Sequence, residues 1–171
     1  MSGSGSGGVT IRDRETGAYT REFFDEIIGR EVERARRHRH TLSVLSVLLA
    51  NWDEVVAGSS LPAATAAMAA AANVIHASVR ETDFVFRWQA DEFVLLLVQA
   101  DLAACARKVE QFGNSFRPWR EGRGPVPTPL RFRVGGSMLE EGVVFAGVLQ
   151  AARAAARERS GEKTAFVPPP S

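Results

Sequence analysis

Cysteine is almost absent from this sequence: Cys105 is the only one among 171 residues. A single cysteine cannot form an intramolecular disulfide, which predicts a reducing compartment. The chain also lacks an apolar run of membrane-spanning length, and no charged segment followed by an apolar one opens it. We therefore expect a cytoplasmic protein without a membrane partner, in which Cys105 packs as a small buried hydrophobe on a helix.

The sequence also lacks a large excess of positive or negative charge. The sequence has 21 Lys and Arg against 20 Asp and Glu, so its net charge is only +1. A dedicated nucleic-acid-binding domain usually carries a strong basic excess, so we expect no nucleic-acid partner. The one basic cluster, residues 34–40, is interpreted as the solvated C-terminal end of a helix, where the helix dipole favours cations. Contact of this cluster with a membrane or a nucleic acid is the less favoured alternative.

The composition is that of an ordinary globular protein. Hydrophobic residues make up 45% of the chain and charged residues 24%, which suits one domain with a sizeable core. Residues 1–8 consist of Gly and Ser after the initial Met and are expected to form a flexible linker. Residues 168–171 form a Pro-rich tail that cannot continue a helix or a central strand. The folded domain is therefore predicted to span residues 9–167.

Hydrophobic periodicity predicts the order of helices and strands. Helices are expected over residues 20–39, 61–80, 101–112 and 144–159, and strands over 41–50, 84–88, 92–98, 130–138 and 164–167. Asp101 is the expected N-cap of its helix, and residues 117–129, rich in Pro, Gly and Arg, are expected to form an exposed loop. This order predicts an α/β (α+β) sandwich with a ferredoxin-like β-α-β-β-α-β core, in which helices flank a central antiparallel sheet. Because that fold hosts many activities, function must be argued from individual residues.

The most informative stretch lies between residues 80 and 93. Arg80 and Asp83 form an R-x-x-D pattern, and the sequence Gln-Ala-Asp-Glu-Phe follows at residues 89–93 after five intervening residues. This arrangement resembles the GGDEF family of bacterial diguanylate cyclases, in which R-x-x-D precedes a G-G-[D/E]-E-F hairpin by five residues. Residues 13–24, 42–53 and 133–137 also resemble family segments, and they occur in the family's order. The resemblance implies a bacterial signalling domain with a nucleotide-cyclase palm fold.

The family resemblance also implies a metal site, and this sequence departs from it. Family members hold two metal ions with carboxylates from adjacent strands, and these ions polarise the phosphates of GTP. Here Asn51 stands at the position of the first metal-binding Asp, or Ala50 if the alignment shifts by one residue. Either change removes a charge where a hard cation prefers anionic oxygen. Asp53 and Asp91 remain nearby, so we interpret these positions as vestigial, with Mg²⁺ relevant only if residual activity exists.

The hairpin signature departs from the family as well. Gln89 and Ala90 replace the two glycines that allow positive φ angles and a close approach of the backbone to the phosphates. The family's guanine-reading segment N-D-x-x-G-H-x-x-G-D has no counterpart in residues 57–65. Asp91 and Glu92 are then expected to be exposed charges after a tight turn, and Phe93 to pack in the core. The sequence therefore predicts a catalytically inactive domain that requires no cofactor.

The R-x-x-D pair matches the site at which family members bind cyclic di-GMP. The guanidinium group of Arg80 suits the O6 and N7 edge of guanine, and the carboxylate of Asp83 can accept from the N1–H and N2–H donors. Arg107 is the candidate for the further Arg that the family recruits from the next helix. The alternative is that Arg80 and Asp83 form only an i,i+3 ion pair that ends the helix.

Three functions therefore compete. The first is a non-catalytic receptor that binds cyclic di-GMP and acts on an unidentified signalling protein. The second is a weak diguanylate cyclase, for which Arg157 and Lys163 are the candidate phosphate contacts. The third is a nucleotide-free module for protein interaction or homodimerisation. Loss of ligand binding in an Arg80 variant would separate the first from the third, and magnesium-dependent GTP turnover would support the second.

Overall fold

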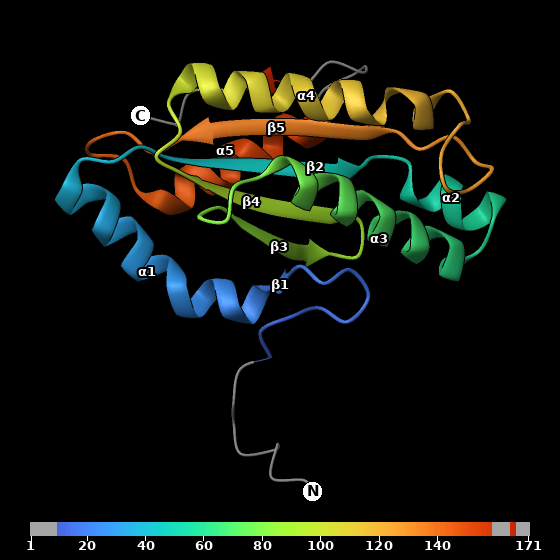
Figure 1. The fold of residues 1–171 in the computed structure, drawn as a ribbon, viewed down its shortest axis with the longest axis horizontal. Helices are drawn as coiled ribbons and strands as arrows, with labels where there is room; N and C mark the ends of the chain where they lie inside the picture. Colours follow the sequence, from blue (N-terminus) through green and yellow to red (C-terminus); the bar gives the residue numbers. More distant parts are fainter. Residues whose placement is uncertain (1–9, 159–164, 167–171) are drawn as a thin grey trace, which may run out of the picture.

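The computed structural model describes residues 10–158 and 165–166 of the chain (Figure 1). The strands are β1 (Tyr19–Thr20), β2 (Leu42–Leu49), β3 (Phe84–Gln89), β4 (Glu92–Val98), β5 (Phe132–Met138) and β6 (Ala165–Phe166). The helices are α1 (Arg21–His38), α2 (Trp52–Gly58), α3 (Leu61–Ser78), α4 (Leu102–Arg120) and α5 (Phe145–Glu158). Within the described ranges, no helix is long and apolar enough to cross a membrane.

The topology confirms the predicted core. One six-stranded sheet has the order β1-β3-β4-β2-β5-β6, and its four inner strands are antiparallel. The units β2-α3-β3 and β4-α4-β5 give the β-α-β-β-α-β connection of the ferredoxin-like fold. The short edge strands β1 and β6 add to this core in parallel with β3 and β5.

Two hydrophobic layers cover the two faces of the sheet. Strand β2 is buried along its whole length, as expected for a central strand covered on both sides. Alternate residues of β2, among them Leu45 and Val47, face the layer that contains α2, α3 and α4. Leu42 and Val44 face the opposite layer, formed by α1 and α5. The β3–β4 hairpin lies beside β2, so its side chains also divide between the two layers (Figure 1).

Local signals in the sequence set the helix ends. The side chain of Asp101 accepts a hydrogen bond from the Ala104 amide at 2.7 Å, so the predicted N-cap is confirmed. Thr20 caps α1 in the same way, with 3.1 Å between its hydroxyl oxygen and the Phe23 amide. The basic cluster indeed forms the last turn of α1, which ends at Arg39 in the left-handed conformation.

Three element predictions need correction. Helix α4 runs to Arg120, eight residues beyond the predicted end, because Phe112 and Phe116 continue its buried face. Residues 117–120 are therefore helical, and Val126 in the following loop is buried, so residues 117–129 are not simply an exposed loop. Strand β1 and helix α2 are additional elements that periodicity did not reveal. The predicted linker and Pro-rich tail lie outside the described residues.

Candidate functional site

The β3–β4 hairpin carries the signature residues 89–93. Gln89 pairs with Glu92, and a register shift between Arg87 and Gln89 marks a bulge just before the turn. Neither Gln89 nor Ala90 has a positive φ angle. The turn therefore does not use the positive φ angles that glycine allows, and its two side chains fit without backbone strain.

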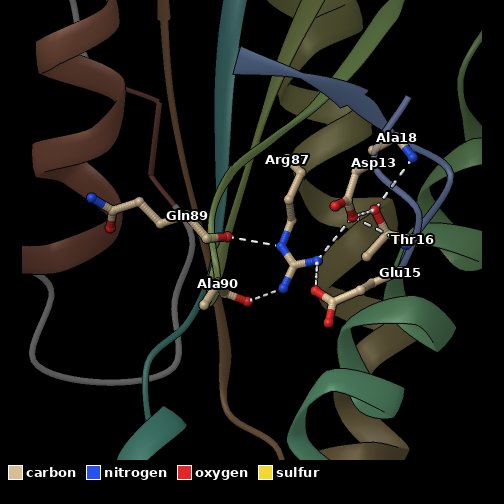
Figure 2. A network of polar contacts seen from close by, with 7 residues as sticks. All are labelled: Asp13, Glu15, Thr16, Ala18, Arg87, Gln89 and Ala90. Carbon is tan, nitrogen blue, oxygen red and sulfur yellow. Dashed lines mark hydrogen bonds and ion pairs between the residues drawn. The ribbon is translucent and has the colours of Figure 1, made fainter. Parts of the chain in front are cut away.

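A buried arginine ties this hairpin to the segment that precedes α1 (Figure 2). Nε and Nη2 of Arg87 donate to the carbonyl oxygens of Gln89 and Ala90 at 2.8 and 2.6 Å. Its Nη1 donates to Asp13 at 3.1 Å and to Glu15 at 3.4 Å. The Asp13 carboxylate is itself held by the backbone amide and hydroxyl of Thr16. Arg87 thus fixes the turn backbone from the side of β1.

Glu92 is fully buried, which corrects the expectation of an exposed charge. Nε and Nη2 of Arg153 donate to its two carboxylate oxygens at 2.9 Å each, and Arg157 donates to Oε1 at 2.8 Å. The hydroxyl of Ser46 donates to Oε2 at 2.8 Å. Burial alone would raise the pKa of Glu92, but the bonds from Arg153, Arg157 and Ser46 outweigh it and lower the pKa.

The residue at the family's first metal position, Asn51, does not fit a divalent cation. Nδ2 of Asn51 donates to the Pro129 carbonyl at 2.8 Å and to Glu54 at 2.5 Å, while its Oδ1 accepts from the Arg131 amide at 3.0 Å. The amide of Asn51 is therefore occupied in joining the end of β2 to the segment before β5. The alternative of a weak cyclase would also need the carboxylate of Glu92 for a metal, and two arginines neutralise that carboxylate.

Asp53 and Asp91 do not complete such a site. Across residues 10–158 and 165–166, no group of three or more His, Cys, Asp or Glu side chains could hold a metal ion. Asp53 lies in the first turn of α2. Asp91 is half-buried, and desolvation raises its pKa above the ordinary value of 3.8. We derive no chemical step through a metal at this site.

Arg80 and Asp83 lie in the turn between α3 and β3, because α3 ends at Ser78 rather than at residue 80. The side chain of Asp83 is 2% exposed, while that of Arg80 is 55% exposed. Oδ2 of Asp83 accepts from the backbone amide and Nε of Arg80, at 3.0 and 3.4 Å. Oδ1 accepts from Nη2 of Arg80 at 3.3 Å and from the Val98 amide at 3.0 Å. Asp83 thus supports Arg80 and the end of β4, instead of presenting free acceptors.

A cavity of about 390 Å³ brings the three predicted ligand-binding residues together. Its wall includes Arg80, Asp83, Gln99, Arg107, Lys108 and Gln111. Arg107 is exposed, and its side chain has no polar partner among the described residues. Lys108 and Gln111 both bond to Ser78, which fastens α4 to the end of α3 beneath the cavity. A volume of this size falls within the range of small-molecule sites.

Sequence reasoning missed several residues that shape these sites. Arg153 was not singled out, although it binds Glu92 together with Arg157, four residues later on the same face of α5. The sequence signal for this pair was the i,i+4 spacing of the two arginines, which places both on one face of a helix. Arg87 and Gln99 left no comparable pattern in the sequence. Lys163, the other candidate phosphate contact, lies outside the described residues.

The sheet topology and the β3–β4 hairpin together are those of the nucleotide-cyclase palm fold. The sequence model of the family described as "Diguanylate cyclase, GGDEF domain" matches residues 10–162. The chain therefore belongs to the GGDEF domain family. No protein with a curated description matches it.

Solved structures of GGDEF domains agree with this assignment. The diguanylate cyclase SiaD of Pseudomonas aeruginosa, solved with its activator SiaC, is 25% identical with a TM-score of 0.81; the match covers 92% of this chain and 62% of SiaD. The GGDEF domain of DgcB from Caulobacter crescentus, solved with c-di-GMP, is 16% identical with a TM-score of 0.82, covering 93% of this chain and 96% of that one. The FimX GGDEF domain of Pseudomonas aeruginosa is 15% identical with a TM-score of 0.78, covering 93% and 100%.

Proposed function

We propose that this GGDEF domain is a receptor for cyclic di-GMP that does not synthesise the dinucleotide. The observation that carries the proposal is the cavity whose wall includes two exposed arginines, Arg80 and Arg107. Arg107 has no polar partner among residues that the structure describes, so its full donor set is available to a ligand. Paired guanidinium groups suit both the acceptor edge of guanine and the phosphates of a cyclic dinucleotide.

The same structure argues against synthesis. A cyclase needs two cations at the hairpin, but the amide of Asn51 is occupied by backbone partners and Glu92 is neutralised by arginines. The alternative of a weak cyclase predicts GTP turnover that depends on Mg²⁺ and is lost in Asp91→Asn. Product formation from GTP in the presence of Mg²⁺, measured by chromatography, would therefore refute the non-catalytic part of the proposal.

Two of the similar structures support the ligand and partner parts of the proposal. The DgcB domain was solved in complex with c-di-GMP, and SiaD in complex with a protein activator. By analogy, we propose that this domain works in the bacterial cytoplasm, where ligand binding changes its contact with a signalling protein or with a second copy of the chain.

Calorimetric titration with cyclic di-GMP tests the receptor function. We expect binding in the micromolar range or tighter for the wild-type chain, and at least tenfold weaker binding for Arg107→Ala, because that variant removes a charged donor. Arg107 makes no polar contact within the described structure, so this substitution should leave the fold intact. Arg117→Ala is the matched control, since Arg117 lies on the same helix and its side chain bonds only to Asn114 among the residues that the structure describes.

The outcomes separate the competing functions. Absence of heat at high ligand concentration would overturn the receptor proposal and leave the nucleotide-free interaction module. Equal affinity in the wild type and Arg107→Ala would place the ligand elsewhere. Arg80→Lys offers a second test, because lysine keeps the charge but loses the planar fork that recognises guanine.

A further inference from the structure

Gln99 connects the proposed ligand cavity to a different part of the molecule. It follows β4 directly and adopts a positive φ of 56°, which is uncommon for a residue with a side chain. The side chain lines the cavity, and its Nε2 lies 3.0 Å from each ring nitrogen of His40. Its backbone amide donates to the Thr41 carbonyl at 2.9 Å. One residue therefore touches both the cavity and the junction between α1 and β2.

Arg80 is already committed to the end of β4 through its hydrogen bonds in this structure. A guanidinium group has one hydrogen on Nε and two on each Nη. The Nε hydrogen bonds to Asp83, and Nη2 bonds both to Asp83 and to the Val98 carbonyl. Within the described part of the chain, Nη1 is the nitrogen that keeps both hydrogens free. Bidentate recognition needs hydrogens from two nitrogens, so a ligand that engages the fork competes with Val98 or Asp83 for Nη2.

We propose that capture of a ligand by Arg80 is coupled to the α1–β2 junction through Val98, Gln99 and His40, an inference that rests on the proposed receptor function. When Nη2 leaves the Val98 carbonyl, the last residue of β4 loses a bond to the turn that precedes β3. Gln99 is the next residue, and its strained backbone gives the strand end an alternative conformation to relax into. Its side-chain contact then transmits the change to His40.

The coupling reaches an open, charged cleft. His40 lines a second cavity of about 570 Å³, in which Arg36 and Arg39 from the end of α1 face Glu140 and Glu141 of the β5–α5 connection. Arg39, Glu140 and Glu141 have no side-chain partner among the described residues. A conformational change at His40 thus alters a surface that carries charges of both signs, which another protein can sense.

Nuclear magnetic resonance of the histidine rings tests the coupling on the full chain. The sequence has three histidines, which single substitutions assign. During titration with cyclic di-GMP, the His40 ring signals should shift with the same midpoint as the calorimetric titration. The His76 ring, which bonds to the Ala72 carbonyl within α3, should stay in place. Calorimetric saturation with unchanged His40 signals would overturn the coupling alone, whereas absence of binding heat would overturn the receptor function and the coupling together.

A substitution at His40 gives an independent test, because coupling free energies are reciprocal. His40→Ala removes the contact that holds Gln99 in the arrangement described above. We expect it to raise the affinity for cyclic di-GMP by about two- to tenfold, the equivalent of one hydrogen bond. His38→Ala is the control, since His38 stacks against His40 but does not contact Gln99. An unchanged dissociation constant in folded His40→Ala would contradict the proposal.

Discussion

Nη1 of Arg87 lies 3.1 Å from Oδ2 of Asp13, although 74 positions separate the two residues in the sequence. The Arg87 side chain is only 8% exposed, and its remaining donors reach the carbonyl oxygens of Gln89 and Ala90. A buried guanidinium group therefore holds two distant segments together, the turn before β1 and the β3–β4 hairpin (Figure 2). Its removal would take one donor from each of two carboxylates, those of Asp13 and Glu15, and from two carbonyl groups.

Arg87→Met should lower the free energy of unfolding by about 2–4 kcal/mol, because breaking a buried ion pair strands its remaining partners. Urea denaturation measures this difference. Arg37→Met is the matched control: Arg37 pairs with Glu33 on the surface of α1, where both side chains are about two-thirds exposed. That pair should contribute no more than roughly 0.5 kcal/mol. Similar losses in the two variants would mean that Arg87 has no special structural role.

Glu92→Gln should also destabilise the fold, by about 2–4 kcal/mol, because Arg153 and Arg157 would lose their counter-charge. The two arginines are partly exposed, which keeps the loss below that of a wholly buried pair. The pKa of Glu92 is lowered from its ordinary value of 4.5, so its stabilising effect is present at neutral pH and is lost as the pH falls through the folded-state pKa. Between pH 7 and pH 3, the difference in unfolding free energy between the wild type and the variant should therefore begin to narrow once the pH falls below 4.5. A constant difference across this range would contradict the assignment.

Asp91 should show the opposite pH dependence. Desolvation raises its pKa above the ordinary value of 3.8, so its ionised form destabilises the folded state at neutral pH. Asp91→Asn should raise the melting temperature at pH 7, and this gain should shrink as the pH approaches 4. The backbone carbonyl of Asp91 still accepts from the Leu49 amide in the variant, so the turn remains intact. A variant that melts below the wild type at pH 7 would show that attraction to Arg87 and Arg157 outweighs burial.

Local patterns in the sequence predicted much of the fold. The apolar run at residues 41–50 predicted a central strand correctly. The prediction worked because both faces of β2 are covered, so nearly every residue of the strand is apolar. The short gap between residues 88 and 92 predicted the hairpin, and Asp101 predicted the start of a helix. These features depend on residues close in the chain, where propensity and periodicity are informative. Helix α2 has seven residues, too few for a clear periodic pattern.

The polar contacts of the site could not be predicted, because they join residues far apart in the sequence. Glu92 was expected to be exposed after its turn, yet Arg153 reaches it across 61 positions. Asp83 was expected to offer its carboxylate to a ligand, yet it accepts from the Val98 amide, 15 positions away. Spacing patterns describe neighbours on one helix or strand, whereas these pairs depend on how α5 and β4 pack against the sheet.

Gly135→Ala tests how closely α5 packs on the sheet. A Cβ atom at Gly135 would lie 2.4 Å from the Ala152 carbonyl oxygen and 2.5 Å from the Ala156 amide, both backbone atoms of α5. The helix would have to move, at a cost of about 1–3 kcal/mol. Gly29→Ala is the control, because nothing lies within 4 Å of a Cβ there and alanine favours the helix. The melting temperature should fall in the first variant and rise in the second; unchanged stability in Gly135→Ala would mean that α5 shifts freely on the sheet.

Asn51→Asp tests whether the family's metal site can be restored by one substitution. The new carboxylate could not donate to the Pro129 carbonyl, and it would face the Glu54 carboxylate that Asn51 now contacts at 2.5 Å. We expect a loss of about 1–3 kcal/mol in stability, the penalty for an unsatisfied, repelled group. Asn51→Ala removes the same bonds without adding charge, so the difference between the two variants measures the repulsion.

Titration of Asn51→Asp with Mg²⁺ then tests whether this position alone prevents metal binding. A cation that binds only the folded state raises the melting temperature in proportion to its occupancy. Because Glu92 stays neutralised by Arg153 and Arg157, we expect Mg²⁺ to leave the melting temperature of Asn51→Asp unchanged at millimolar concentration. A rise that saturates with Mg²⁺ in Asn51→Asp but not in the wild type would show that the remaining carboxylates still form a site. In that event the loss of a single charge at Asn51, rather than the arginine pair on Glu92, would account for the poor fit to a metal.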